Sequence, residues 1–294
     1  MTLNSTLNTP QFLQENTTTL DVLSLQKQKL ELIGQKSINK LLIDADFIVY
    51  KSCAAAETEI DWSDDTILVT SNFNDAYNAT LRELTKIRDK FGALTPIILF
   101  FSDTKNFRKK ILPEYKGHRN RKKPCGYKRV INKLKTEFDV IIMPELEADD
   151  AMGIYATQYP GNTIVSPDKD MRQIPGKLYN LDELFTVSPN EGAAWHLTQS
   201  MAGDQTDGYG GVPGIGVKRA ETLFNKKGCS WQTVVEAFED KGLTEEDALL
   251  NARLARILTI DDYDQQSQTP RLWTPASGYE VNYGAGSQDE GNRR

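Results

Sequence analysis

Acidic residues recur in this sequence where short apolar, strand-like runs end. LLIDAD reaches Asp44, ILFFSD reaches Asp103, and two later runs lead into PELEADD and VSPDKD. Parallel strands in α/β proteins bring their carboxyl ends to one edge of the sheet, where ligands bind, so we expect these carboxylates to share a crevice. Such a concentration of negative charge is costly unless cations neutralise it, and Mg²⁺ and Mn²⁺ favour oxygen ligands. The pattern predicts a metal-dependent phosphoryl-transfer enzyme.

The first candidate metal ligands are Asp44 and Asp103. Each ends a strand, and the two strands must be neighbours if both carboxylates are to reach one ion. An Asp after a strand can instead cap the next helix, and for either residue alone the two interpretations are equally good. In ELEADDAMG, Glu147 and Asp150 are spaced to share one helix face, with Asp149 about a third of a turn away.

Two further acidic pairs follow. Asp168 and Asp170 alternate, so in extended chain both would face one way and Lys169 the other. MAGDQTDGYGG adds another pair. Two metal ions about 4 Å apart could activate a water and stabilise the leaving oxygen of an in-line displacement. The predicted ligands are Asp44, Asp103, Glu147, Asp149, Asp150, Asp168, Asp170, Asp204 and Asp207.

A basic segment lies next to the acids. Between Lys105 and Lys135 there are thirteen Lys or Arg and one acid, a balance of 13 − 1 = +12, although the whole chain has a net charge of −6. A basic arm gathers phosphates and releases their counterions, so a polyanion is the expected substrate. A solvated, Lys-rich helix face is the alternative, but prolines and glycines interrupt the run. The arm residues predicted to bind DNA are Lys105, Arg108, Lys109, Arg121, Lys122 and Lys123.

A glycine-rich stretch, GYGGVPGIG, spans residues 208–216. A tight turn of this kind between helices exposes backbone groups to a phosphodiester chain, and the next helix, starting near Val217, adds N–H groups that favour phosphate. Its carbonyl groups could also hold K⁺. An ordinary helix–helix hairpin needs one Gly rather than four. The predicted DNA contacts here are Gly211, Gly214, Gly216, Lys218 and Arg219.

The elements that must position these residues follow an α/β pattern from near Lys40. Strands are predicted at 41–45, 96–102, 139–143 and 162–166. Helices are predicted at 73–91, 126–137 and 147–158, and later at 193–201, 218–225, 231–238 and 245–259. The alternation predicts an α/β fold with a mainly parallel central sheet flanked by helices.

This pattern also predicts the domain organisation. We expect an N-terminal extension, an α/β catalytic domain that contains the basic arm near 104–126, a helical DNA-binding subdomain with the glycine-rich hairpin, and a disordered tail. Their predicted ranges are 1–38, 39–190, 191–275 and 276–294.

Composition narrows the class of protein. Hydrophobic content of 39% and charged content of 26% are typical of soluble globular proteins, and no run is apolar enough to span a bilayer. Three widely spaced cysteines and no signal pattern favour a reducing cytoplasm. The two histidines, His118 and His196, lie outside the acidic motifs, which argues against zinc hydrolase and Ser-His-Asp chemistry.

Taken in order, LLIDAD, FFSDTKNFRKKILPEYKGHR, ELEADDAMG, VSPDKDMRQI and MAGDQTDGYGGVPGIGVKRAETLF resemble the flap endonuclease/5′-nuclease superfamily. The resemblance is greatest to the short-tailed, T-seven-like phage 5′→3′ exonucleases, whose WHL helix, ARLARIL helix and terminal RLWTP also occur here. It covers about residues 40–275. It implies a PIN-like/5′-nuclease fold with a C-terminal helix–hairpin–helix-like subdomain, and a 5′→3′ exonuclease or flap-type nuclease of phage DNA replication or recombination.

The resemblance also implies residue roles. Asp44, Asp103, Glu147 and Asp149, with Asp150 beside them, match a first metal cluster, and Asp168, Asp170, Asp204 and Asp207 match a second. Lys116 and Arg119 match arm residues that contact the scissile phosphate, and Tyr115 matches a position that stacks on a base near the 5′ end. Residues 211–218 match the element that holds the duplex and a K⁺ ion.

The implied cofactors are two Mg²⁺ ions, replaceable by Mn²⁺. The implied partners are duplex DNA with a free 5′ end, nick or flap, RNA–DNA hybrids, and replication proteins, with no membrane. Two alternatives stay open. A PIN-like ribonuclease uses a similar acidic pocket, although the glycine-rich hairpin suits duplex DNA better. A non-catalytic DNA-structure-binding protein would not need the full set of acids.

Overall fold

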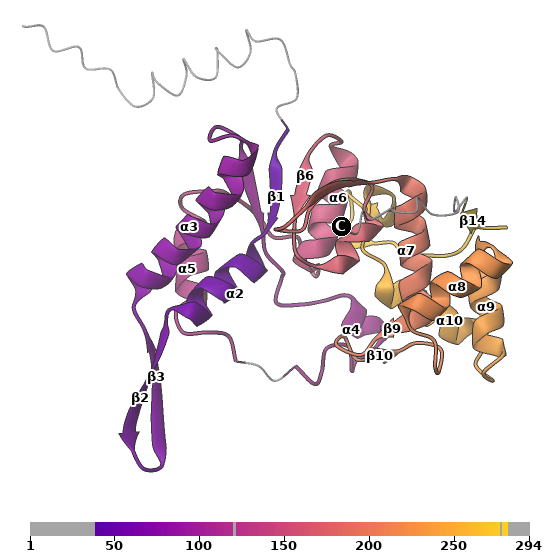
Figure 1. The fold of residues 1–294 in the computed structure, drawn as a ribbon, viewed down its shortest axis with the longest axis horizontal. Helices are drawn as coiled ribbons and strands as arrows, with labels where there is room; N and C mark the ends of the chain where they lie inside the picture. The colour runs from indigo at the N-terminus through magenta and orange to yellow at the C-terminus, as the bar shows by residue number, and fades with distance from the viewer. Residues whose placement is uncertain (1–38, 120–121, 277, 282–294) are drawn as a thin grey trace, which may run out of the picture. The chain divides into compact units, whose positions relative to one another are not determined.

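A six-stranded sheet forms the centre of the computed structural model, which describes residues 39–119, 122–276 and 278–281 (Figure 1). The strand order is β5-β4-β1-β6-β7-β8, and every neighbouring pair is parallel except β7 with β8. The predicted α/β class with a mainly parallel sheet is confirmed. The strands are β1 (Leu41–Asp44), β4 (Ile97–Phe100), β5 (Asp139–Ile141), β6 (Thr163–Val165), β7 (Gly176–Tyr179) and β8 (Leu184–Val187).

Helices cover both faces of the sheet, because alternate strand residues point to opposite sides. Leu41 and Ile43 pack under α2 (Ala45–Ala55), α3 (Phe73–Phe91) and α5 (Tyr127–Leu134). Leu42 packs on the other face against α6 (Ala148–Gln158). Burial on both faces explains why these strands read as unbroken apolar runs in the sequence.

Four further helices form a second apolar cluster: α7 (Pro189–Ala202), α8 (Val217–Lys227), α9 (Trp231–Glu239) and α10 (Glu245–Ala255). All four predicted helices are present. α7 starts earlier than predicted, because Ser188 caps it with Pro189 in its first turn. α10 ends earlier, since Arg256 is extended and the chain continues across the start of α6. The boundary near residue 190 stays a prediction, because α7 also contacts the short helix η1 (Lys169–Gln173).

Several elements were not predicted. α2 follows β1 without a break, so its periodicity is hidden in a longer apolar run. The hairpin of β2 (Glu57–Ser63) and β3 (Thr66–Ser71) does alternate in sequence around an acidic turn, a signal that could have found it. The small elements are α4 (Arg108–Ile111), η2 (Ile260–Asp262), and the strand pairs β9 (Gly203–Asp204) with β10 (Tyr209–Gly210), and β12 (Tyr263–Asp264) with β13 (Thr269–Pro270).

The predicted disordered tail is wrong for its first residues. β14 (Glu280–Val281) pairs antiparallel with β11 (Cys229–Ser230), and Val281 is buried in the helical cluster. The rest of that tail, 282–294, and the predicted extension, 1–38, lie outside the described residues. Among the helices that are described, we find none with the length and apolar character needed to cross a bilayer.

Candidate active site

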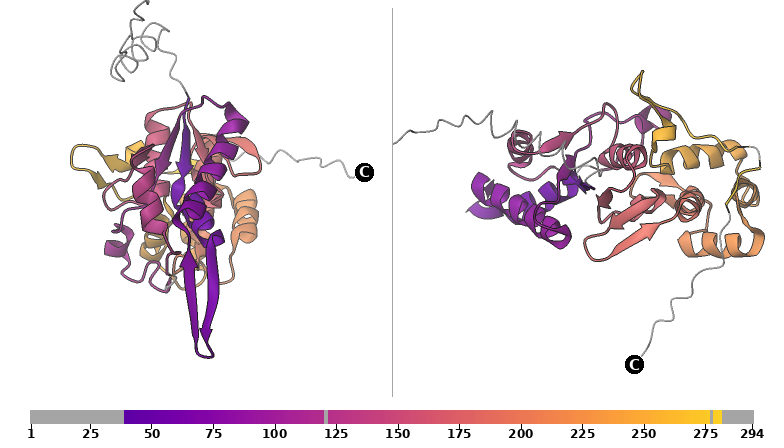
Figure 2. Two further views of the ribbon diagram at one scale, coloured as in Figure 1. Left: turned by 90° about the vertical axis from the view of Figure 1, so that its left-hand side faces the viewer. Right: turned by 90° about the horizontal axis from the view of Figure 1, so that it is seen from above.

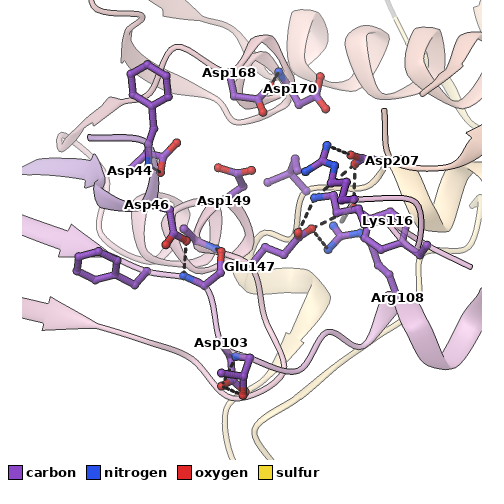
Figure 3. A pocket seen from close by; sticks show the side chains of 18 of the residues that line it. Asp44, Asp46, Asp103, Arg108, Lys116, Glu147, Asp149, Asp168, Asp170 and Asp207 are labelled. Carbon is purple, nitrogen blue, oxygen red and sulfur yellow. Dashed lines mark hydrogen bonds and ion pairs between the residues drawn. The ribbon is translucent and has the colours of Figure 1, made fainter. Parts of the chain in front are cut away.

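Acidic side chains from separate parts of the chain line one cavity of about 970 Å³ (Figure 3). It opens where β1 and β6 end, the edge of a parallel sheet at which ligands bind. Figure 2 shows the same fold from two further directions. The acids on its wall are Asp44, Asp46, Asp103, Glu147, Asp149, Asp168, Asp170, Asp204 and Asp207.

Asp44 serves both roles that the sequence left open. Its carboxylate accepts a hydrogen bond from Phe47 N (3.2 Å) and so caps α2, and Ser166 Oγ donates to it at 3.1 Å. It also faces the other acids. Burial raises the pKa of Asp44 to about 6, and the charges of Asp46 and Asp168 add to the increase.

Asp149 lies at the centre of the acids in Figure 3. Burial raises the pKa of its carboxyl well above the usual range, and the negative charges of Asp44, Asp168 and Glu147 raise it further. Carboxyl groups that disfavour one another's ionisation in this way require positive charge if all are to be ionised together.

The start of α6 differs from the prediction. Glu147 is the extended N-cap residue (φ −78°, ψ 161°) and not part of the helix, so it does not share a face with Asp150. Asp150 is fully buried and accepts two hydrogen bonds from Arg108, at 2.7 and 2.8 Å. The predicted metal ligand Asp150 and the predicted DNA contact Arg108 are both wrong, because the two side chains bind each other.

Arg108 is 1% exposed and connects three elements. Its Nε donates to the Leu254 carbonyl of α10 at 2.9 Å, and its Nη1 lies 3.4 Å from Glu147 Oε2. The ion pair with Asp150 fixes α4 against α6. Arg108 thus holds a positive charge beside Glu147 without reaching solvent.

Tyr115 is buried, with 2% of its surface exposed. Its hydroxyl oxygen lies 3.0 Å from Glu147 Oε2 and 2.9 Å from Asp207 Oδ2, so its single proton is shared between the two carboxylates. The predicted stacking of Tyr115 on a DNA base is wrong, since the ring is packed inside the protein. Its role here is to hold two carboxylates together.

Lys116 and Arg119 reach the acids directly. Lys116 Nζ is 2.5 Å from Glu147 Oε1 and 3.5 Å from Asp207 Oδ2, and Arg119 Nη2 is 2.6 Å from Asp207 Oδ1. Burial would raise the pKa of Glu147, but Lys116 and Arg108 outweigh it and lower that pKa to about 2. Glu147 is therefore ionised at any neutral pH.

The second pair of acids is arranged by η1. Asp168 caps this helix by accepting from Asp170 N at 2.8 Å, so the segment is not extended as predicted. Lys169 does not point away, because its Nζ is 3.8 Å from Asp204 Oδ2. Burial and the charge of Asp168 raise the pKa of Asp170 to about 7.

Asp103 lines the cavity but does not join the other acids. Its carboxylate accepts from the backbone of Glu145 (2.8 Å) and Thr104 (2.7 Å), and Figure 3 shows it apart. β1 and β4 are neighbours as predicted. The acid that was missed is Asp46, which accepts from Ser102 N at 2.7 Å and from Tyr127 Oη at 2.5 Å. The second Asp of the DAD motif was the available signal.

The described residues contain no preformed site in which three Asp, Glu, His or Cys side chains surround one ion. Lys116 and Lys169 lie against carboxylates that a metal would use. The donors themselves fit a hard divalent cation, because burial and the charges of neighbouring acids raise the pKa values of Asp44 and Asp149 in a shared cavity. Asp168 contributes its negative charge to both, so Asp44, Asp149 and Asp168 form the group that suits such an ion best.

Apart from Arg108, the described arm residues that were predicted to bind DNA are exposed. Lys105, Lys109, Lys122 and Lys123 all reach solvent, and Lys123 also lines the cavity. Arg121, another predicted contact, lies outside the described residues.

The glycine-rich turn depends on its glycines. A Cβ at Gly211 would lie 2.1 Å from the Ala202 carbonyl carbon, and Gly214 has φ +80°. α8 begins at Val217, as predicted, and Arg219 donates to the Gly214 carbonyl. Gly216 and Lys218 are exposed beside it, so the turn presents backbone N–H groups and positive charge to solvent.

Comparison with known proteins places these features in context. A family model described as "5′-3′ exonuclease, N-terminal resolvase-like domain" matches residues 39–191. The chain is 31% identical over 284 residues to the exonuclease of Escherichia phage T7, a match covering 80% of this chain and 93% of that protein. It is 29% identical over 282 residues to the exodeoxyribonuclease of Enterobacteria phage T3, covering 81% and 93%.

The fold is similar to that of a phage T5 protein crystallised with metal ions. The TM-score is 0.57 at 16% sequence identity, and the match covers 74% of this chain and 89% of the other.

Proposed function

Because the chain belongs to the 5′-3′ exonuclease family, we propose that it hydrolyses phosphodiester bonds at or near the 5′ ends of duplex DNA. One observation carries the proposal. Carboxylates from β1, α6, η1 and the β9–β10 turn meet in a single cavity, next to the cationic side chains of the basic arm. The names of the phage T7 and T3 relatives, exonuclease and exodeoxyribonuclease, support the same activity.

Divalent metal ions are the implied cofactor. Asp44, Asp149 and Asp168 would hold one, and Asp170, Asp204 and Asp207 a second, as ligands that are hard oxygen donors. Such ions, Mg²⁺ or Mn²⁺, would neutralise charge on the phosphoryl group and lower the pKa of a bound water. The metal ions in the similar phage T5 structure support this assignment.

The chain's own cations have a separate task. Lys116 and Arg119 are held at Glu147 and Asp207, at the border between the basic arm and the acids. An incoming phosphate would compete with the two carboxylates for Lys116 and Arg119. Ion pairs with these side chains would then stabilise the negative charge of the phosphate. Lys116 Nζ and the Tyr115 hydroxyl both contact the Glu147 carboxylate. Glu147 and Tyr115 therefore position Lys116 for that exchange.

The exposed lysines of the arm and the glycine-rich turn would hold DNA on either side of the cavity. Phosphate contacts of this kind orient the duplex without reading sequence. We also assign to the turn a K⁺ ion bound by backbone carbonyls. The test is whether K⁺, compared with Na⁺ at equal ionic strength, increases DNA affinity, and whether Gly214→Ala removes the difference.

The decisive experiment digests 5′-labelled nicked, flapped, blunt and RNA–DNA hybrid duplexes with Mg²⁺ and measures the product lengths. Short products from recessed or nicked 5′ ends support an exonuclease, whereas flap-length products support a flap endonuclease. Asp149→Asn should abolish cleavage and leave DNA affinity nearly unchanged, because it removes a central carboxylate and no basic group. Cleavage by this variant at the wild-type rate would disprove the site.

The biological setting follows from this activity. If a phage encodes the chain, we propose that it acts in the host cytoplasm during DNA replication or recombination. RNA–DNA hybrids would be cleaved by the same cavity, and the substrate panel tests this directly.

A further inference from the structure

The β2–β3 hairpin exposes an unusual concentration of apolar side chains. It extends from the ends of α2 and α3, away from the sheet (Figures 1 and 2). Trp62 at its tip is 71% exposed. Large apolar residues elsewhere on the described surface are exposed singly, whereas contiguous exposed groups mark interaction sites. The members of this group are Ile60, Trp62, Ile67, Leu68 and Val69.

The two faces of the hairpin differ in chemistry. Ile60 is paired with Leu68, so both lie on one face, which carries no charged residue. Glu59 is paired with Val69 and Asp61 with Ile67, so the other face combines carboxylates with apolar groups. A β-bulge between Asp61 and Ser63 turns the strand at Trp62.

The charge of the hairpin argues against DNA as its ligand. Residues 57–71 contain five acids and no Lys or Arg, a balance of −5, whereas residues 105–135, which include the arm, have a balance of +12. Phosphates would be repelled from this surface. A second copy of the same hairpin is disfavoured for the same reason, because the two would bring ten carboxylates together. The complementary partner carries basic and apolar side chains.

One edge of the hairpin is free to pair. In the described part of the chain β2 and β3 pair only with each other. On the β3 side, the Cys125 thiol donates to the Val69 carbonyl at 3.6 Å. On the β2 side, Cys125 N donates to the Glu57 carboxylate at 2.7 Å at the base of the hairpin. Beyond Glu57, the backbone of β2 has no hydrogen-bond partner outside the hairpin among the residues that the structure describes. Two-stranded hairpins are marginally stable alone and gain stability from a third strand, which an exposed edge can recruit.

We propose that the β2 edge binds an extended segment of a partner protein in which basic and apolar residues alternate. The segment would add a third strand, with its backbone paired to β2. Its apolar side chains would lie over Ile60 and Trp62, and its basic side chains would lie beside Glu59 and Asp61. The proposal does not depend on the nuclease activity.

The test uses a fluorescein-labelled peptide of alternating Lys and Val, and a control peptide of the same composition with the Lys and Val residues clustered. Fluorescence anisotropy should show saturable binding of the alternating peptide to the full chain. Ile60→Thr/Trp62→Ser and Glu59→Gln/Asp61→Asn should each weaken it about tenfold or more, a loss of about 1.4 kcal/mol. Leu94→Ser removes an exposed apolar side chain on a distant loop and should change nothing.

Other outcomes overturn the proposal. Equal binding of the clustered peptide, or equal binding to the hairpin variants, would mean that only net charge is recognised. A loss of DNA affinity in Ile60→Thr/Trp62→Ser would make the hairpin a DNA contact. Sedimentation of the wild type as a dimer that this variant dissociates would make a second copy the ligand. The hairpin variants should keep the wild-type nuclease rate and unfolding midpoint, which shows that the fold is intact.

Discussion

The carboxylates that line the cavity or lie directly behind its wall divide into those that already have cationic partners and those that do not. Glu147, Asp150 and Asp207 are bonded to Arg108, Lys116 or Arg119. Asp44 and Asp149 have no cation within salt-bridge distance in the described residues, and their pKa values are raised by burial and by neighbouring acids. The unpaired group is where divalent ions would contribute most.

Arg108 illustrates why a buried cation matters here. Arg108→Met should destabilise the protein by about 3–5 kcal/mol, because it leaves the buried carboxylate of Asp150 without a partner. The double variant Arg108→Met/Asp150→Leu should recover most of that stability but not the nuclease rate, since Glu147 still lacks its neighbour. Urea unfolding measures the first effect and cleavage of a nicked duplex the second.

The neighbouring Lys109 provides the matched control. It is exposed, so Lys109→Met should change the free energy of unfolding by less than about 0.5 kcal/mol. A small loss in Arg108→Met, comparable to that of Lys109→Met, would show that the ion pair is not important for the fold.

Lys116 offers a second test, of whether a cationic side chain acts at the reacting phosphate or only in DNA binding. Lys116→Met should lower the turnover number by about 100-fold or more and weaken DNA binding by less than about threefold, because this side chain acts at the reacting phosphate. Lys105→Met, in the exposed part of the arm, should weaken binding and leave turnover nearly unchanged. If the two variants behave alike, Lys116 only positions the DNA backbone.

The sequence predicted which acids approach the cavity, but not what they bind. The ends of the strands can be recognised in the sequence, and eight of the nine metal ligands predicted from it line the cavity. The exception, Asp150, pairs with a residue 42 positions away, and no local pattern reveals such a contact. Glu147 could lie inside the helix or cap it, and a single backbone angle decides between the two. The choice changes the directions in which the neighbouring side chains point.

At the level of elements, four strands of the central sheet and the long helices were predicted, because they are buried on characteristic periods. The strands β7 and β8 of the same sheet were not predicted. α2 was hidden by its continuity with β1, and the ends of α7 and α10 were set by caps and by contacts with distant residues. The C-terminal strand β14 was missed because its two residues are ordered by distant contacts, the pairing with β11 and the burial of Val281 in the helical cluster. Short elements of this kind have no periodicity to detect.

The packing of α7 on α10 predicts a dependence of stability on pH. His196 on α7 is fully buried, its Nε2 lies 2.9 Å from the Ala252 carbonyl, and its ring packs edge-on against Trp273. Burial lowers the pKa of His196 to about 3, and the charge of Arg256 lowers it as well. The unfolded chain, with an ordinary His pKa of about 6.5, therefore binds a proton that the folded chain refuses.

Stability should fall as the pH decreases from about 6.5 towards 3, with a contribution from His196 of up to about 1.4 kcal/mol per pH unit. Urea unfolding at pH 7.5, 6.0 and 5.0 measures this slope. His196→Gln should flatten it, whereas His118→Gln, at an exposed position, should not. Identical slopes in all three proteins would contradict the effect, since the acidic residues titrate equally in each.

The whole molecule carries a net charge of −6 and yet separates its charges by region. Nine acids line the cavity and five lie in the hairpin, whereas residues 105–135 contain thirteen Lys or Arg and one acid. We therefore expect a nucleic acid to be attracted to the arm and repelled from the hairpin, so charge contributes to the orientation of DNA on the surface. The negative net charge by itself would have argued against an enzyme that acts on nucleic acids.

This separation predicts a salt dependence that belongs to the arm. The logarithm of the DNA-binding constant should fall linearly with the logarithm of salt concentration, by about 0.9 for each phosphate neutralised. Lys122→Ala/Lys123→Ala should reduce that slope by about 2, because both side chains are exposed in the arm. Arg82→Ala/Lys86→Ala removes the same charge from exposed positions of α3, outside both the arm and the cavity, and should leave the slope unchanged. Equal reductions in both double variants would mean that total charge, and not its position, governs binding.

Fluorescence titration of a nicked duplex measures these slopes. A range of about 50 to 200 mM KCl is suitable, and Asp149→Asn serves as the background to prevent cleavage.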